Sequence, residues 1–136
     1  MRYDGKVYFL IRRTEDASIC VYPTKYLKHK TTSNRSPNTV KRIAFSLSYF
    51  MGYLKEQGRQ FEDVYEMTYS AQMEFFQNFL YWVKGGKHIS GEVRKIPDNG
   101  TCNAYLHDVF GFYQFLEMEY EPVSYTHLRA HETSLH

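Results

Sequence analysis

The stretch SPNTVKRIAFSLSYFMGYLKEQG, residues 36–58, predicts a long amphipathic helix. Ser36 is a residue type that caps helix N-termini, and Pro37 suits the first helical position because the N–H that proline lacks has no partner there. Gly58 is the residue type that commonly follows a helix C-terminus. Apolar residues recur between these ends every three or four positions, which predicts one buried face. That face consists of Val40, Ile43, Ala44, Leu47, Met51 and Leu54, with Arg35, Asn38, Arg42, Ser46 and Tyr49 on or near the opposite side.

Two further helical patterns flank this stretch. Residues 23–30, PTKYLKHK, predict a short helix that Pro23 opens and that ends at the turn-forming SNRSP. A third helix is expected from about residue 70 to residue 84, with Thr68 or Ser70 as its N-cap. Its buried face consists of Phe76, Phe79, Leu80 and Val83.

A fourth helix is expected from residue 101 to about residue 117, with Asn99 or Thr101 as its N-cap. Its inward residues are Leu106, Val109, Tyr113 and Leu116. The four helices predict a small all-α bundle, and 136 residues fit one domain. We place that domain at residues 24–118.

The segments on either side of the helices have other patterns. The β-rich runs KVYFLI (6–11) and SICVY (18–22) predict an N-terminal arm or β-hairpin within residues 1–23. The polar, Gly- and Pro-containing KHISGEVRKIPDN (87–99) predicts an excursion loop.

The end of the chain changes composition abruptly after Pro122. VSYTHLRAHETSLH, from residue 123, has no helical or strand period and resembles translated adapter sequence at the ends of fragmentary reading frames. We therefore expect residues 119–136 to be a disordered tail, non-native from residue 123, and the native chain to continue differently.

The overall composition is that of a globular protein. Hydrophobic residues make up 43% and charged residues 24%, and the aromatic content of 18% predicts a core built on rings. Seventeen Lys and Arg against fifteen Asp and Glu leave a net charge of +2, which excludes a strongly basic protein of the chromatin type. Any cationic surface must therefore come from segregation of charge.

Several classes of protein and site are not indicated. No apolar run reaches the roughly 18 residues of a membrane span, and the charged N-terminus is unlike a secretory signal, so we expect a soluble cytoplasmic protein with no membrane partner. Cys20 and Cys102 stand far apart, which favours reduced packing thiols. His29, His88 and His107 lack zinc-ligand spacing, so no metal or other cofactor is expected.

Charge is segregated along the sequence. Residues 17–55 contain no Asp or Glu, whereas residues 56–83 are mainly acidic and Glu117, Glu119 and Glu121 follow at the end of the last helix. The cations of the acid-free stretch are Lys25, Lys28, Lys30, Arg35, Lys41, Arg42 and Lys55. Lys84, Lys87, Arg94 and Lys95 form a second basic cluster beside the excursion loop.

The acid-free stretch also gathers hydroxyl and amide side chains where the long helix begins. Such donors, together with cations and helix N–H groups, suit the phosphates of duplex nucleic acid. The plainer interpretation is a solvated helix face. Most rings are spaced as core, and only Tyr49, Tyr53 and Tyr105 are candidates to reach a ligand.

Two segments resemble a known family. SPNTVKRIAFSLSYFMGYL (36–54) is similar to the opening helix of the SAM-like core-binding domain of tyrosine recombinases, the phage integrases, and TCNAYLHDVFGFYQFLE (101–117) is similar to its final helix. The two occur in the family's order, with an acidic helix between them. The family often has basic residues where Ala104, Tyr105 and Phe110 stand here.

The resemblance implies a four-helix domain that forms half of a clamp around duplex DNA at a recombination site. Strand cleavage in that family belongs to a following domain, so this chain is expected to bind DNA beside other recombinase protomers without being an enzyme on its own. Matches to the family's motifs assign DNA contacts to Ser36, Asn38, Thr39, Lys41 and Arg42, and to Thr101, Asn103 and His107. The basic stretch adds Lys28, Lys30 and Arg35.

A second hypothesis is a helical protein-interaction module. It gains weight if Tyr49, Tyr53, Phe112 and Phe115 form one contiguous exposed patch of more than several hundred Å². A free-standing enzyme with a small-molecule substrate is not expected, because the sequence has no Gly-rich phosphate loop, HExxH or GxSxG motif.

Overall fold

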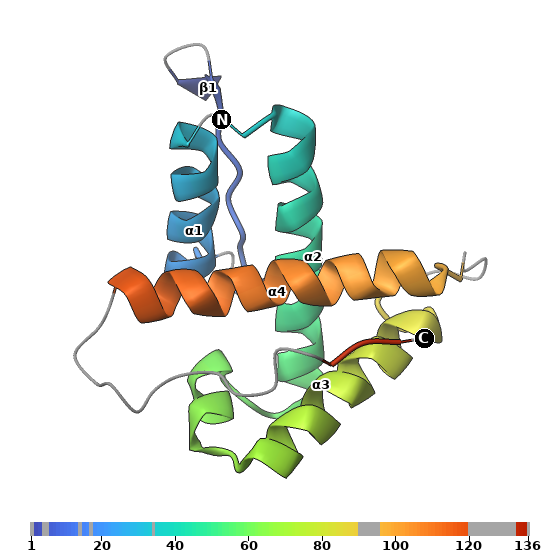
Figure 1. Ribbon diagram of the computed structural model, residues 1–136. Helices are drawn as coiled ribbons and strands as arrows, with labels where there is room; N and C mark the ends of the chain where they lie inside the picture. Colours follow the sequence, from blue (N-terminus) through green and yellow to red (C-terminus); the bar gives the residue numbers. More distant parts are fainter. Residues whose placement is uncertain are drawn as a thin grey trace.

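The predicted all-α bundle is confirmed by a computed structural model of the protein (Figure 1). The structure describes residues 2–3, 6–13, 15–16, 18–33, 35–89, 96–119 and 133–135. The helices of the described residues are α1 (Val21–Thr32), α2 (Pro37–Gln57), the 3₁₀ helix η1 (Phe61–Glu66), α3 (Tyr69–Lys84) and α4 (Asn99–Glu119). The sequence patterns did not predict η1.

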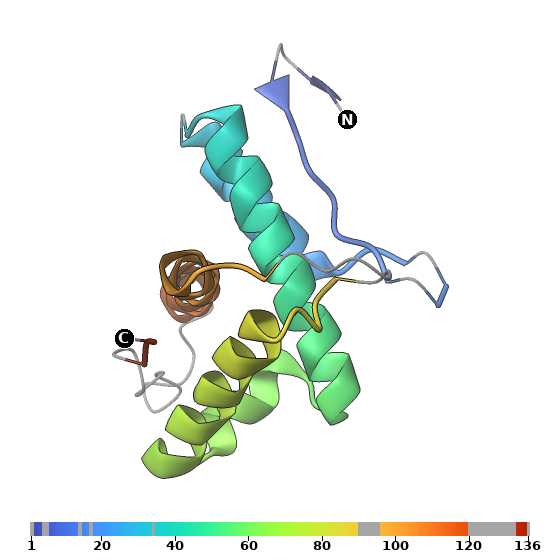
Figure 2. The same ribbon diagram turned by 90° about the vertical axis from the view of Figure 1, so that its right-hand side faces the viewer.

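Helices α2 and α4 hold the bundle together, since they pack against each other and each also packs against α1 and α3. Helices α1 and α2 run side by side and are joined by a short connection at one end of the molecule (Figure 1). Helix α4 crosses one face of this pair, and α3 packs against α4 near the opposite end of α2 (Figures 1 and 2). The angle between α4 and the α1–α2 pair creates the corner in which the candidate site lies.

The ends of α2 are fixed by local chemistry, as the sequence predicts. The Thr39 N–H donates to Ser36 Oγ at 3.2 Å, and Gly58 ends the helix with a left-handed φ of 69°. Helix α3 is capped by Thr68, whose hydroxyl oxygen accepts the Ala71 N–H at 3.2 Å.

The starts of the other two helices differ from prediction. The N-cap of α4 is Asp98, not Asn99 or Thr101, because its carboxylate accepts the Thr101 N–H at 2.7 Å. Helix α1 begins at Val21, which places Pro23 in the first turn, where a missing N–H costs no hydrogen bond. The helical region thus spans residues 21–119, slightly more than the predicted residues 24–118.

The core is largely aromatic, as the composition predicts. The ring of Phe50 on α2 lies 5.4 Å from that of Phe79 on α3 and 6.0 Å from that of Tyr113 on α4. A second cluster joins α1, α2 and α4 around Leu27 and Leu47, both fully buried. The expected apolar face of α2 is confirmed.

Two expected surface residues are instead in the core. Ser46 is fully buried because its side of α2 faces α4. Tyr53 is 2% exposed, and its hydroxyl donates to the Phe75 carbonyl at 2.8 Å, so it cannot reach a ligand. Both errors arise because α2 is covered on more than one side.

The N-terminal segment contains short antiparallel pairs. Strands β1 (Arg2–Tyr3) and β2 (Lys6–Val7) pair with each other, and Arg12 pairs with Ile19 as an isolated bridge. The end of the predicted run SICVY belongs to α1 instead.

Some predictions concern residues that the structure does not describe. Residues 90–95 of the excursion loop and residues 120–132 of the tail lie outside the described residues. Of the predicted tail, residues 133–135 lie beside α4, where the Asn103 side chain accepts the Leu135 N–H at 2.7 Å and donates to its carbonyl at 2.8 Å. Within the described ranges, none of the helices has the length and apolar character needed to cross a membrane.

Gly111 marks a close approach of α1 and α4, because a Cβ there would lie 2.6 Å from Tyr26 Oη. We expect Gly111→Ala to lower the free energy of unfolding by about 1–3 kcal/mol, since the Tyr26 ring is packed and cannot withdraw. Adding Tyr26→Phe removes the clashing oxygen, and the double variant should gain about 0.5–1 kcal/mol over Tyr26→Phe alone from better helix propensity. Urea denaturation of the wild type, the two single variants and the double variant checks this. A double variant less stable than Tyr26→Phe alone would contradict it.

Alkaline pH should unfold the bundle. Burial raises the pKa of Tyr26 and of Tyr53 to about 12, whereas an unfolded tyrosine titrates near 10. Their contribution to stability is therefore complete below pH 10 and is lost as the pH rises from about 10 to about 12. Urea denaturation across this pH range should show that Tyr53→Phe loses less of its free energy of unfolding than the wild type does. Tyr81→Phe, at an exposed position, should lose as much as the wild type.

Candidate nucleic-acid interface

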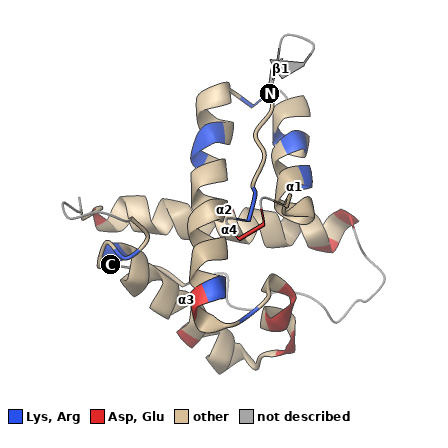
Figure 3. Ribbon diagram, turned by 180° about the vertical axis from the view of Figure 1, so that it is seen from behind, with Lys and Arg blue, Asp and Glu red and all other residues tan. Residues whose placement is uncertain are grey.

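Five of the seven cations of the acid-free stretch lie toward the end of the molecule where α1 is joined to α2, which we call the basic end: Lys28, Lys30, Arg35, Lys41 and Arg42. Lys25 and Lys55 lie nearer the other ends of these two helices. Figure 3 shows blue segments on both helices and their connection, with red segments on η1 and at the C-terminal end of α4. Lys28, Arg35, Lys41 and Arg42 are exposed there, and Lys30 is half-buried. The segregation of charge in the sequence is therefore also a segregation in space.

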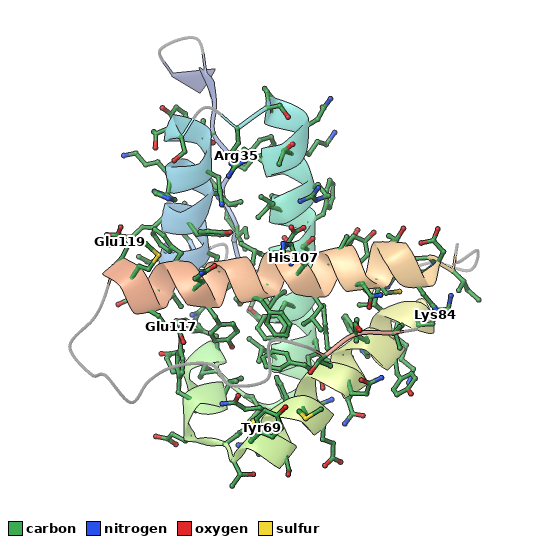
Figure 4. The ribbon with its side chains drawn as sticks, in the orientation of Figure 1. Arg35, Tyr69, Lys84, His107, Glu117 and Glu119 are labelled. Atoms are coloured by element: carbon green, nitrogen blue, oxygen red, sulfur yellow. The ribbon has the colours of Figure 1, made fainter. Side chains whose placement is uncertain are left out.

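A cavity of about 430 Å³ opens in the corner between α1, α2 and α4. Figure 4 shows Arg35 between the ends of α1 and α2, and His107 on α4, which crosses below. Five of the predicted contact residues line this cavity: Lys30, Arg35, Thr39, Arg42 and His107. The structure thus brings together residues that are up to 77 positions apart in the sequence, from residue 30 to residue 107.

An adjoining cavity of about 440 Å³ lies further along α4. It shares Arg42 and His107 with the first and adds Asn103, together with Thr133 and Ser134 from the end of the chain. Asn103 therefore already holds a peptide group of this chain through both of its side-chain polar atoms.

The remaining predicted residues lie outside the two cavities. Lys28, Asn38 and Lys41 are exposed at the basic end, and Ser36 is exposed at the cap of α2. Thr101 is half-buried in the first turn of α4, where its N–H is bound by Asp98. The structure does not bring Thr101 to the basic end.

An ion pair between exposed Arg42 and buried Asp108 forms one wall of the corner. Arg42 donates from Nη2 to Asp108 Oδ1 at 2.9 Å and from Nε to Oδ2 at 3.2 Å, and Ser46 Oγ lies 2.7 Å from Oδ2. The Asp108 side chain is 3% exposed and that of Arg42 is 51% exposed. The hydrogen bonds that Arg42 donates to Asp108 raise the pKa of Arg42, which stays charged.

Sequence reasoning missed Asp108. The signal was available, because Asp108 stands three residues after Tyr105 and four before Phe112, which puts it on the apolar side of α4. An acid at such a position needs a buried partner. Arg42 is the cation that α2 offers.

The floor of the corner is Tyr26. Lys30 Nζ lies 5.4 Å from the centre of its ring, within cation–π distance. Burial raises the pKa of Tyr26 to about 12, with Asp108 adding to the effect, so the phenol stays neutral at pH 7. The corner therefore offers cations and neutral donors, which suits binding of an anion.

The rings that would favour a protein-interaction module do not form one exposed patch. Tyr53 is 2% exposed and Phe112 is fully buried. Tyr49 and Tyr105 pack against each other at 5.2 Å and enclose His88, whose pKa burial lowers. The specific surface on which the second hypothesis depends is therefore not formed.

The described ranges contain no group of three or more His, Cys, Asp or Glu side chains that could hold a metal ion. No protein-family model, no curated protein and no solved structure matches this chain. The similarity to tyrosine recombinases therefore stays a hypothesis that residues 36–54 and 101–117 carry.

Arg42→Ala should leave the Asp108 carboxylate buried with only Ser46 beside it. We expect a loss of about 1.5–3 kcal/mol in the free energy of unfolding, the range for hydrogen bonds to charged groups. Lys41→Ala, one residue away and exposed, should change it by less than about 0.5 kcal/mol. Urea denaturation checks the difference, and equal stability of the two variants would show that the ion pair contributes nothing.

Proposed function

We propose that this chain is a duplex-DNA-binding domain of the tyrosine recombinase core-binding type, which grips a recombination site through its phosphates. The supporting observation is the gathering of Lys30, Arg35 and Arg42 around one cavity, with Lys28 and Lys41 exposed elsewhere on the same two helices. These residues come from two helices and their connection, so a rigid bundle presents them together.

The chemistry of this surface favours backbone contacts over base reading. Cations and small donors such as Ser36 and Asn38 meet phosphate oxygens and fix a protein on the duplex without reading its sequence. Single-strand binding instead relies on exposed stacking rings, whereas Tyr53 and most of the phenylalanines are buried. Double-stranded DNA is therefore the favoured partner.

The proposed role is positioning rather than strand cleavage. In the family that the chain resembles, the cleaving residues belong to a following domain, and the domains of several protomers assemble on one DNA site. Tyr26 is the tyrosine that lines the cationic cavity, and a phenol with a pKa of about 12 is poorly suited to act as a nucleophile at neutral pH.

Salt dependence tests the proposal. Each phosphate neutralised contributes about −0.9 to the slope of log affinity against log salt. Replacing both Arg35 and Lys41 with Ala should therefore make the slope about 1.8 less negative. Arg42 is left in place, because its removal would leave the buried Asp108 carboxylate without its cationic partner.

The measurement is fluorescence anisotropy with a labelled duplex of about 20 base pairs between 50 and 200 mM NaCl, where such contacts change affinity strongly. The matched control is Lys55→Ala with Arg59→Ala, which removes the same charge from the other end of α2. Lys55 pairs with Glu15 at the surface, and such pairs contribute little to stability. No binding by the wild type, or the same change of slope in both double variants, would refute the proposal.

A further inference from the structure

We propose that the cavity between α1, α2 and α4 is a phosphate pocket, which seats one phosphate group between Lys30, Arg35, Arg42 and Thr39. A backbone phosphate of DNA and a free phosphate ion present the same tetrahedral oxygens. That the phosphate comes from DNA rests on the function proposed above; the pocket itself does not.

The charges that line the cavity are unbalanced. Lys30, Arg35 and Arg42 face it, and Asp108 is the one acidic residue among its lining residues. Asp108 already accepts two hydrogen bonds from Arg42 and lies 2.7 Å from Ser46 Oγ. Arg42 uses two of the five N–H groups of a guanidinium in this way, so three remain for another acceptor. An anion in the cavity would balance the excess positive charge.

Two of the three cationic side chains, and the backbone that carries the third, are held in place before any anion arrives. Arg42 is fixed by Asp108, and Lys30 lies over the Tyr26 ring. The Arg35 N–H donates to the Lys30 carbonyl at 3.3 Å, which ties the connection to the end of α1. A site whose groups are already ordered loses less entropy on binding.

Lys30 and Arg35 also repel each other in the free protein. Burial lowers the pKa of Lys30, and the nearby Arg35 guanidinium lowers it further. A phosphate between the two would attract both cations and so offset their mutual repulsion. The arrangement is therefore better suited to the bound state than to the empty one.

Neutral donors complete the pocket. Ser36 donates to Thr39 Oγ1 at 2.9 Å, which leaves the Thr39 hydroxyl hydrogen for another acceptor. His107 and Gln114 are exposed on the α4 side of the cavity. The volume of about 430 Å³ accommodates a phosphate group with several waters, each of which takes about 30 Å³ in the liquid.

The test is a titration of the whole chain with inorganic phosphate, for the wild type and for variants of its basic residues. Titration at constant ionic strength, followed by ¹⁵N–¹H NMR, should give saturable shifts at the amides of Thr39, His107 and Gly111.

Two variants of the cavity should each weaken phosphate binding at least about tenfold, equivalent to about 1.4 kcal/mol: Lys30→Met, which keeps the stem over Tyr26, and Arg35→Ala. The matched controls Lys28→Ala and Lys41→Ala each remove a charge from an exposed position of the same two helices outside the cavity lining, and they should weaken phosphate binding less than about twofold. Shifts that do not saturate, or an equal loss in the controls, would overturn the pocket.

A second arm identifies the source of the phosphate. Duplex DNA added to the phosphate-saturated protein should release the phosphate and return the shifts to those of the DNA complex alone. DNA that binds while phosphate stays in place would overturn the assignment to backbone phosphate and support a free ion as the ligand. Saturable phosphate binding by a protein that does not bind DNA would refute the function proposed above and leave the pocket standing.

Discussion

The Arg42–Asp108 ion pair joins the interior of this protein to its candidate binding surface. One partner is buried and the other is half exposed, so the pair fixes where α4 crosses α2 and also orients a cation at the rim of the cavity. A buried carboxylate is costly unless it is paired and hydrogen-bonded. Asp108 meets this requirement through Arg42 and Ser46, two positions one helical turn apart on α2. The corner between the helices, and with it the cavity, depends on this contact.

Aromatic packing supplies the rigidity around that contact. Tyr26 approaches the backbone of α4 at Gly111, which lacks a side chain, and its ring lies 5.8 Å from that of Phe112. Lys30 Nζ lies 5.4 Å from the centre of the same ring. The close approach of α1 and α4 therefore sets the depth of the cavity and places one of its cations, so core and surface are built from the same side chains.

The sequence was sufficient where structure is decided locally. The bounds of α2 follow from Ser36, Pro37 and Gly58, which act within one turn of the helix ends, and the fold class follows from the helical periods. Tyr53 and Ser46 were misplaced because a period identifies one buried face, whereas α2 meets α1, α3 and α4 on several sides. Five predicted contact residues line one cavity, but the partner of Arg42 is 66 residues away, and no local pattern specifies such a pairing.

A net charge of +2 is small for the polyanion binding that we propose, but the positions of the charges matter more than their sum. The acids of η1 and of the end of α4 lie away from the α1–α2 connection (Figure 3). Charges further apart than the Debye length, about 8 Å at physiological salt, are largely screened from one another. A phosphate at the corner would therefore respond mainly to Lys30, Arg35, Arg42 and the satisfied Asp108. The local excess of cations, rather than the total charge of the chain, determines what this surface can hold.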